Sequence, residues 1–404
     1  MAGILEGRDC LGIMPTGGGK SICYQLPSLL LDGVTLVVSP LISLIKDQVD
    51  VLNSMGIPAA FINSTMTSSQ IDKRCGQILH GDYKIVYIAP ERLESERFLE
   101  LISRIRVPLI AVDEAHCISQ WGHDFRPSYM NISRMVQHLA ERPIIAAFTA
   151  TATDKVMNDI AANLRMKSPR IVRTGYSRDN LAFSVVKGES KKEFLHQYIF
   201  GNKSQSGILY ASTRKEVDLW HQQLLKWGVQ AGKYHAGMPE EERSRNQEMF
   251  LFDDLKVMVA TNAFGMGIDK SNVRYVIHLN LPKKSRSLLP GSGPCRKGRG
   301  RERVHTDVCA AGHYDAEIFL IEQSGSDPGR QNAEYGNLKK MIDYCHTSLC
   351  LQKVIVQYFG DFEYGECGKC SNCTDDKERV NITTEAQKIF FPASSGWGSG
   401  SASG

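Results

Sequence analysis

The chain has 404 residues, of which 42% are hydrophobic, and its formal net charge is +4. Single domains usually contain about 100–200 residues, so this length predicts more than one domain. So small a net charge is compatible with a nucleic-acid partner but does not indicate one. No apolar run reaches the ~18–20 residues of a membrane span, and the first ten residues lack the basic head and long apolar stretch of a signal peptide. We therefore expect a cytoplasmic protein with no membrane partner.

The first motif in the chain is a glycine-rich segment with the sequence MPTGGGKS, residues 14–21. Glycines leave backbone N–H groups free to surround a polyphosphate, because a side chain would block its approach. Lys20 would reach the β- and γ-phosphates, and Ser21 would ligate Mg²⁺ at the positive end of a following helix. The segment predicts Mg·ATP binding, and a plain loop is the alternative. The predicted nucleotide-binding residues here are Thr16, Gly17, Gly18, Gly19, Lys20 and Ser21.

Short β-branched runs alternate with amphipathic stretches through the first 177 residues. This alternation is typical of a doubly wound parallel sheet, an α/β fold. In such a sheet the chemistry lies at the carboxyl ends of the strands, where polar residues follow each run here. The predicted strands include residues 34–40, 84–90, 108–114 and 143–150.

Asp113 and Glu114 directly follow the apolar run LIAV. Asp113 would hold Mg²⁺ through water, and Glu114 would position and deprotonate the water that attacks the γ-phosphate. An acidic pair alone is often no more than a solvated strand end. This pair lies 93 residues after Lys20, and the two motifs together predict a catalytic site.

The order of these motifs resembles that of superfamily 2 helicases. Lys20-Ser21, the DEAH sequence at 113–116 and FTATAT at 148–153 look like motifs I, II and III of that superfamily. The resemblance implies ATP hydrolysis and adds one residue to the acidic pair. The catalytic residues that it implies are Lys20, Asp113, Glu114 and His116.

The segment CISQWGHDFRPSY, residues 117–129, is similar to the aromatic-rich loop of the RecQ family. By that resemblance, Trp121, Phe125 and Arg126 would contact single-stranded DNA and report its presence to the ATP site. Aromatic rings stack on bases of any sequence and arginine pairs with phosphate, which agrees with this role. Packing of Trp121 and Phe125 in the core is the alternative.

A second series of alternating strands and helices begins after about residue 178, which predicts a second parallel sheet and a pair of RecA-like domains. SGILYASTR, residues 206–214, resembles motif IV, and ATNAFGMGIDK, residues 260–270, resembles motif V. By the second resemblance, Thr261 would grip the DNA backbone, while Gly265, Gly267 and Asp269 would couple DNA to the nucleotide.

The next family motif, Gln-x-x-Gly-Arg-x-Gly-Arg, is missing from its expected place, where PGSGPCRK stands at 290–297. One nucleotide string encodes PGSGPCRK from its first base and Gln-Glu-Ala-Gly-Arg-Ala-Gly-Arg from its second. The sequence therefore predicts a frame-shifted motif VI within an aberrant stretch, 285–314, that has no periodicity. The two arginines would fall at Pro294 and Lys297, and their loss predicts impaired hydrolysis. A basic DNA-binding loop is the competing interpretation.

Cysteines gather near the end of the chain. Cys350 lies 17 residues before Cys367, and Cys370 and Cys373 follow at intervals of two intervening residues. Four soft ligands in close pairs suit a structural, tetrahedral Zn²⁺, and the spacing resembles the RecQ zinc subdomain, with Cys345 left unliganded. Disulfides are the alternative, which a reducing compartment disfavours.

We expect four parts: an ATP-binding domain at 1–177, a second RecA-like domain at 178–330, a zinc subdomain at 331–380 and a disordered tail at 381–404. The resemblance implies a RecQ-type, ATP-dependent DNA helicase that uses Mg²⁺ and Zn²⁺ and acts on single-stranded and forked DNA in the 3′→5′ direction, in recombination and repair. Protein partners are unknown. From the resemblance, we expect the chain to start too late for the family's adenine-recognition motif and to end where a winged-helix domain would follow. The alternatives are a DNA-stimulated ATPase that does not unwind and a DNA-binding remnant.

Overall fold

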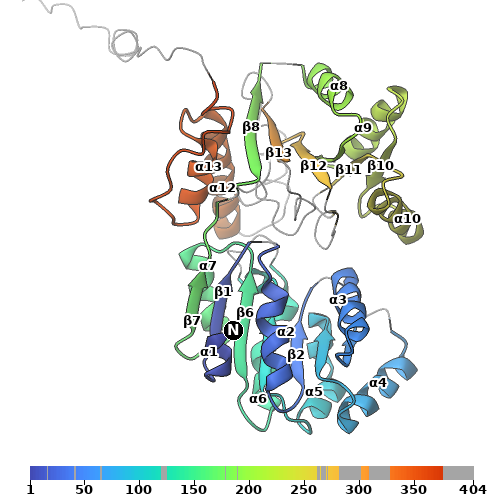
Figure 1. Cartoon of the computed structure of the whole chain (residues 1–404), viewed down its shortest axis with the longest axis vertical. Helices are drawn as coiled ribbons and strands as arrows, with labels where there is room; N and C mark the ends of the chain where they lie inside the picture. The colour runs from blue at the N-terminus through green and yellow to red at the C-terminus, as the bar shows by residue number, and fades with distance from the viewer. Residues whose placement is uncertain are drawn as a thin grey trace, which may run out of the picture. The chain divides into compact units, whose positions relative to one another are not determined.

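The computed structural model describes residues 1–375 except 16, 41, 64–65, 120–124, 178, 189, 262–263, 265–269, 271, 282–301 and 309–327; for 43, 302–308, 328–330 and 333 it describes the backbone alone. Two fully parallel sheets organise these residues (Figure 1). The α/β fold class predicted from the sequence, with two parallel-sheet domains, is confirmed. None of the helices in the described part of the chain combines the length and apolar character that a bilayer crossing requires.

The first sheet has seven strands in the order β3-β4-β2-β5-β6-β1-β7. Four-residue strands predominate, and all but the edge strand β7 are buried along most of their length. The strands are β1 (Cys10–Ile13), β2 (Thr35–Val38), β3 (Ala59–Ile62), β4 (Ile85–Ile88), β5 (Leu109–Val112), β6 (Ile144–Thr149) and β7 (Arg170–Arg173).

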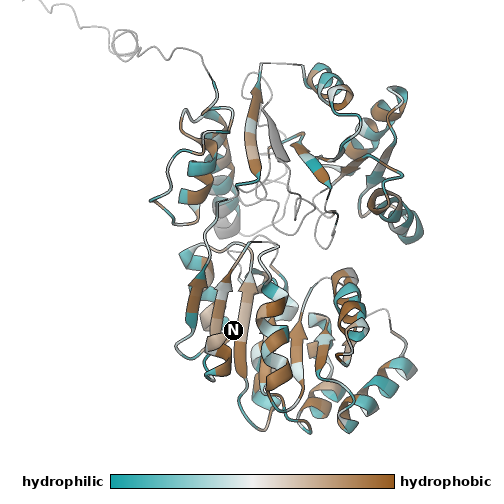
Figure 2. Ribbon diagram, in the orientation of Figure 1, coloured by the Kyte–Doolittle hydropathy of each residue, from teal (hydrophilic) through white to brown (hydrophobic). Residues whose placement is uncertain are grey.

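Helices cover both faces of this sheet. Alternate residues of one strand enter different apolar clusters: Leu36 and Val38 belong to one, and Val37 belongs to the other. Burial on both faces explains why these strands read as continuous apolar runs, coloured mainly as hydrophobic in Figure 2. The helices are α1 (Ala2–Leu5), α2 (Lys20–Leu30), α3 (Ile42–Ser54), α4 (Ser68–His80), α5 (Glu96–Ile102), α6 (Asn131–His138) and α7 (Asp154–Asn163), with the short 3₁₀ helices η1 (Pro90–Glu94), η2 (Ala115–Ile118) and η3 (Pro127–Met130).

The second sheet has six strands in the order β10-β11-β9-β12-β13-β8. They are β8 (Leu181–Lys187), β9 (Ser206–Tyr210), β10 (Ala231–Tyr234), β11 (Val257–Ala260), β12 (Val273–His278) and β13 (Glu302–Val308), with helices α8 (Lys191–Gly201), α9 (Arg214–Lys226) and α10 (Glu240–Leu251). Two further helices follow, α12 (Pro328–His346) and α13 (Leu351–Tyr358).

Strand β13 is the main departure from the sequence-based expectation. It lies within the stretch 285–314, for which the sequence showed no periodicity, yet it pairs in parallel with β12 on one side and β8 on the other. Backbone hydrogen bonds form a ladder without requiring any side-chain pattern, so an interior strand can occupy this position. Its sequence, ERVHTDV, is unusually polar for an interior strand of a parallel sheet.

Candidate nucleotide-binding site and cysteine cluster

Three neighbouring strands of the first sheet place the predicted catalytic segments together. β6 pairs with β5 on one side and with β1 on the other, so the chain leaves all three strands at the same edge of the sheet. The glycine-rich segment follows β1, Asp113 follows β5, and Thr149 ends β6. The carboxyl ends of parallel strands are where ligands bind in such sheets.

The glycine-rich segment has the geometry of a phosphate-binding turn. Gly19 is the residue before α2 and adopts a left-handed conformation, with φ 78° and ψ 28°, that disfavours any residue with a side chain. At Gly18, an added Cβ would lie 2.9 Å from the carbonyl oxygen of Pro15. α2 begins at Lys20, as predicted, so its N-terminal N–H groups and its positive dipole end face this turn. Thr16 lies outside the described residues.

Lys20 and Glu114 form a buried ion pair. Lys20 Nζ donates to Glu114 Oε1 at 3.4 Å, and both side chains are about nine-tenths buried. Glu114 Oε2 lies 3.2 Å from His116 Nδ1, which in turn lies 2.9 Å from Thr149 Oγ1. One network thus joins the segments that resemble motifs I, II and III. These predicted residues converge in the structure, and their individual roles stay predictions.

Asp113 and its neighbours complete the acidic end of the network. Asp113 Oδ2 accepts a hydrogen bond from Ser39 Oγ at 3.5 Å, and Ser39 directly follows β2. Ser21, the other predicted Mg²⁺ ligand, is the second residue of α2 and is partly buried. A hydroxyl on a helix and a carboxylate at a strand end are oxygen ligands that suit Mg²⁺, so the donor set fits the predicted metal.

The structure describes only some of the predicted DNA-binding residues. Phe125 and Arg126 are partly buried, and Arg126 Nη1 donates to the carbonyl oxygen of Pro40 at 3.2 Å. Thr261 directly follows β11, and its N–H donates to Tyr234 O at 3.2 Å. Trp121 lies outside the described residues, and so do Gly265, Gly267 and Asp269, predicted to couple DNA to the nucleotide, and Pro294 and Lys297 of the aberrant stretch.

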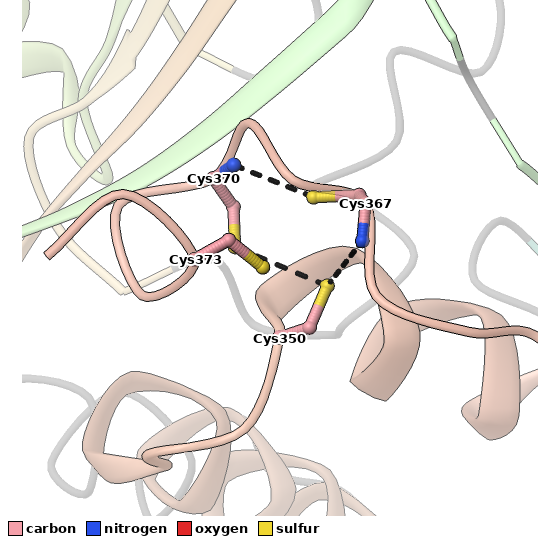
Figure 3. A group of neighbouring side chains, drawn as sticks. All are labelled: Cys350, Cys367, Cys370 and Cys373. Atoms are coloured by element: carbon pink, nitrogen blue, oxygen red, sulfur yellow. Dashed lines mark hydrogen bonds between the residues drawn. The ribbon is translucent and has the colours of Figure 1, made fainter.

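The four predicted zinc ligands form one cluster (Figure 3). The sulfur atoms of Cys350, Cys367, Cys370 and Cys373 all lie within 4.8 Å of one another. The two sulfurs of Cys350 and Cys370 are 3.9 Å apart. Zn–S bonds of 2.3 Å in a tetrahedron give a sulfur–sulfur separation of about 3.8 Å. The cluster therefore fits a four-cysteine zinc site.

Backbone N–H groups surround this cluster. Cys350 Sγ accepts from Lys353 N at 3.5 Å and from Cys367 N at 3.3 Å, and Cys370 Sγ accepts from Leu351 N at 3.4 Å. Burial opposes ionisation of Cys370, but hydrogen bonds from the N–H groups of Leu351 and Cys373 and from neighbouring thiols lower the pKa of its thiol below the usual value, whereas burial raises the pKa of the Cys373 thiol to about 12. N–H donors of this kind stabilise thiolates, the form of cysteine that binds metal.

Cys345 lies apart from the cluster, as predicted. It is buried on α12, and that burial raises the pKa of its thiol to about 12. A thiol this difficult to ionise behaves as a small apolar side chain. None of the described cysteines forms a disulfide.

Sequence reasoning missed the contacts that link these segments. It noted polar residues at the strand ends, which include Ser39 and Thr149, but assigned them no partners. It assigned no role to Tyr129, whose hydroxyl donates to Asp113 O at 2.9 Å. A position at the end of a strand was the available signal for Ser39 and Thr149. Nothing local marks Tyr129, because its partner lies 16 residues away.

Two RecA-like parallel-sheet domains, a phosphate-binding turn with an acidic pair, and a four-cysteine cluster define a protein of the helicase class. Three family models match in this order: DEAD/DEAH box helicase at residues 1–160, helicase conserved C-terminal domain at 190–296, and RecQ zinc-binding at 316–374. The chain belongs to the RecQ family of helicases.

Curated relatives agree with this assignment. ATP-dependent DNA helicase RecQ of Bacillus subtilis is 49% identical over 94% of this chain, and RecQ of Pasteurella multocida is 38% identical over 96%. The RecQ-like DNA helicase BLM of Xenopus laevis is 38% identical over 92% of this chain, which spans 29% of that protein. The chain spans 64% and 61% of the two bacterial relatives, or somewhat less than two thirds of their length.

Solved structures share the fold. Mss116p bound to single-stranded RNA and AMP-PNP superposes with a TM-score of 0.63 at 16% identity, covering 87% of this chain and 82% of that one. Mycobacterium smegmatis helicase Lhr, bound to single-stranded DNA and AMP-PNP, gives 0.58 at 21% identity, covering 79% of this chain and 46% of that one. At these identities the likeness concerns the fold alone.

Proposed function

We propose that this chain is an ATP-dependent DNA helicase that couples Mg·ATP hydrolysis to movement along single-stranded DNA, 3′→5′ by family resemblance, and to unwinding of forked DNA in recombination and repair. The observation that carries the proposal is the convergence of Lys20, Glu114, His116 and Thr149 in one buried network. Relatives named as DNA helicases support the choice of DNA.

Each residue of the network has a role in this proposal. Lys20 would bind the β- and γ-phosphates, Ser21 and Asp113 would hold Mg²⁺, and Glu114 would orient and deprotonate the attacking water. The metal would supply charge neutralisation on the phosphates. His116 and Thr149 would relay the state of the nucleotide to the segment after β6, because both lie in the hydrogen-bonded chain that starts at Glu114.

DNA would contact the segment after η2 and the segment after β11. Trp121 and Phe125 would stack on bases, Arg126 would pair with phosphate, and Thr261 would bind the backbone. Gly267 and Asp269 would then couple this grip to the nucleotide. Zn²⁺ held by Cys350, Cys367, Cys370 and Cys373 would be structural, since four cysteines leave no open coordination position.

A second candidate function is favoured by PGSGPCRK at 290–297. Without the two arginines of motif VI, the chain would bind ATP and DNA and hydrolyse ATP slowly without unwinding. A strand-displacement assay on a forked duplex separates the two candidates.

We propose a cytoplasmic location for either one, consistent with described cysteines that form no disulfide.

Binding of a fluorescent ATP analogue tests the nucleotide site directly. We expect the chain to bind it in the presence of Mg²⁺ and Lys20→Ala to bind it at least about tenfold more weakly, because a charge-assisted contact to phosphate contributes ~1.5–3 kcal/mol. The control is Lys84→Ala, because Lys84 lies outside the network and donates a hydrogen bond to Leu31 O. Equal affinity of the Lys20→Ala protein and the unmodified chain would exclude Lys20 from the site.

A further inference from the structure

The peptide group between Asp113 and Glu114 is held on both of its sides. Its carbonyl oxygen accepts a hydrogen bond from Tyr129 Oη at 2.9 Å. Its N–H donates to the carboxylate of Asp113 at 3.0 Å. Two hydrogen bonds at opposite ends of one peptide plane fix its rotation about the chain.

This peptide needs such support because Glu114 has a left-handed backbone, with φ 45° and ψ 45°. Residues with a side chain adopt that conformation at a cost in free energy, and they keep it only where the surroundings hold them. The conformation directs the Glu114 carboxylate between Lys20 and His116. Rotation of the 113–114 peptide would therefore move the group proposed as the general base.

Tyr129 is placed to hold this peptide rigidly. It lies in η3, is fully buried, and packs in the apolar core of the first domain. Its hydroxyl is protonated at neutral pH and can donate, and burial raises its pKa still further above the usual value. A buried ring with two side-chain torsions has little freedom to shift.

Tyr129 also belongs to the segment proposed to contact DNA. Tyr129 N donates to Arg126 O at 3.0 Å, and Arg126 N donates to Cys117 O at 2.9 Å. Arg126 Nη1 reaches Pro40 O, next to the Ser39 that bonds Asp113. A displacement of residues 125–126 would thus reach Asp113 both through Tyr129 and through the segment after β2.

We propose that Tyr129 is a positioning residue that sets the orientation of the Asp113–Glu114 peptide and couples it to Arg126. The inference rests on the proposed ATPase function, since it assigns Glu114 as the group that must be oriented. Tyr129 ends the segment that resembles the aromatic-rich loop, but that resemblance assigned it no role.

Tyr129→Phe tests the inference because it removes the hydroxyl and keeps the ring. Tyr87→Phe is the matched control: Tyr87 is equally buried in the same domain, and its hydroxyl accepts from Gln25 Nε2 at 2.8 Å. Two measurements are needed. The first is amide hydrogen exchange of residues 113–119. The second is the single-turnover rate of ATP cleavage, with protein in excess over ATP and with and without a dT oligonucleotide. Melting temperatures of both variants report any general loss of stability.

We expect Tyr129→Phe to accelerate amide exchange in residues 113–119. It should also lower the rate of ATP cleavage about tenfold, which is the rate equivalent of one hydrogen bond. The affinity for Mg·ATP should change less than about twofold, because Tyr129 orients the base without touching the nucleotide. Tyr87→Phe should change neither readout. Unchanged exchange and rate in Tyr129→Phe, or equal changes in both variants, would overturn the inference. If the unmodified chain itself cleaved no ATP, the proposed function would fail, while the exchange comparison would still decide the role of Tyr129.

Discussion

Glu114 combines three unusual properties in one residue. It has a left-handed backbone, its carboxylate is about nine-tenths buried, and that carboxylate faces both Lys20 and His116. Burying a charge is unfavourable unless the charge is paired, and strained backbones concentrate at functional sites. Because of these properties, removing the proton-accepting carboxylate of Glu114 should have a clear effect on ATP turnover.

Replacing Glu114 with glutamine should lower ATP turnover by ~10²–10⁴, the usual contribution of a general base, and leave Mg·ATP affinity nearly unchanged. The amide keeps the size of the side chain but cannot accept a proton from water. Phosphate release at saturating ATP measures the turnover, and binding of a fluorescent analogue measures the affinity. Glu100→Gln, at an exposed glutamate of α5, is the control. Equal turnover in Glu114→Gln and the unmodified chain would remove Glu114 from the mechanism.

At this scale the sequence predicted residue types but not their contacts. Lys20, Asp113 and Glu114 were predictable because a glycine-rich turn and an acidic pair after an apolar strand are local patterns. The left-handed conformation of Glu114 and the hydroxyl donors from Ser39 and Tyr129 depend on which strands become neighbours. Tertiary contacts of this kind leave no mark in the flanking sequence.

At the level of elements, the folding of the cysteine cluster at the N-terminus of α13 should depend on a bound metal. Cys350 precedes α13, and its sulfur accepts from Lys353 N, so one residue caps the helix and joins the cluster. Asn372 donates to the carbonyl oxygens of Thr347 and Leu349, which ties the 367–373 loop to the start of α13. With little apolar core in this loop, a bound metal would supply much of its folding free energy.

We therefore expect one tightly bound zinc per chain and its loss in Cys370→Ser, with unfolding of residues 345–375. Cys345→Ser is the matched control, because Cys345 is also buried but lies outside the cluster. Elemental analysis counts the metal, and limited proteolysis reports the unfolding. Well under one zinc per chain in the unmodified protein, or equal metal loss in the two variants, would contradict the zinc assignment.

The last residue of β12 provides a test of the second sheet by pH. His278 is fully buried and stacks on Tyr210 at 5.3 Å, and burial lowers the pKa of its imidazole from 6.5 to about 4. Between these two values the unfolded chain binds a proton that the folded chain does not, so stability falls as the pH falls. Above pH 6.5 the imidazole is neutral in both states and has no such effect.

We expect the free energy of unfolding to decrease by about 2 kcal/mol more between pH 7.5 and pH 5 in the unmodified chain than in His278→Phe. Phenylalanine keeps a ring beside Tyr210 but cannot take up a proton. Urea unfolding at the two pH values measures the difference. The same loss of stability in both proteins would show that His278 does not titrate in this window.

The sequence predicted most of the elements of the first sheet but not all strands of the second. Runs such as those of β2, β4 and β5 are apolar on both faces and are visible without a structure. β13 was not predicted, because ERVHTDV lacks an apolar pattern and its place between β12 and β8 comes from backbone pairing. The frame shift proposed for the surrounding stretch stays a prediction.

For the whole molecule, the rate of ATP hydrolysis depends on whether the two domains can work without the arginines of motif VI. An arginine that reaches the γ-phosphate supplies ~10³–10⁵ of rate, because its rigid guanidinium matches the phosphoryl oxygens of the transition state. Pro294 has no charge, and Lys297 offers a flexible point charge. ATP would still bind at Gly17–Ser21 and Asp113, so turnover should suffer far more than affinity.

The most direct test is the rate of phosphate release at saturating Mg·ATP and dT oligonucleotide, measured for the chain as it stands and after Pro290–Lys297 is replaced by Gln-Glu-Ala-Gly-Arg-Ala-Gly-Arg. We expect the replacement to raise the rate at least ~10²-fold, a conservative part of the range for an arginine in this role. The same replacement in the Glu114→Gln background should raise it little. Hydrolysis at tens per second with PGSGPCRK in place, or no hydrolysis after the replacement, would contradict the account.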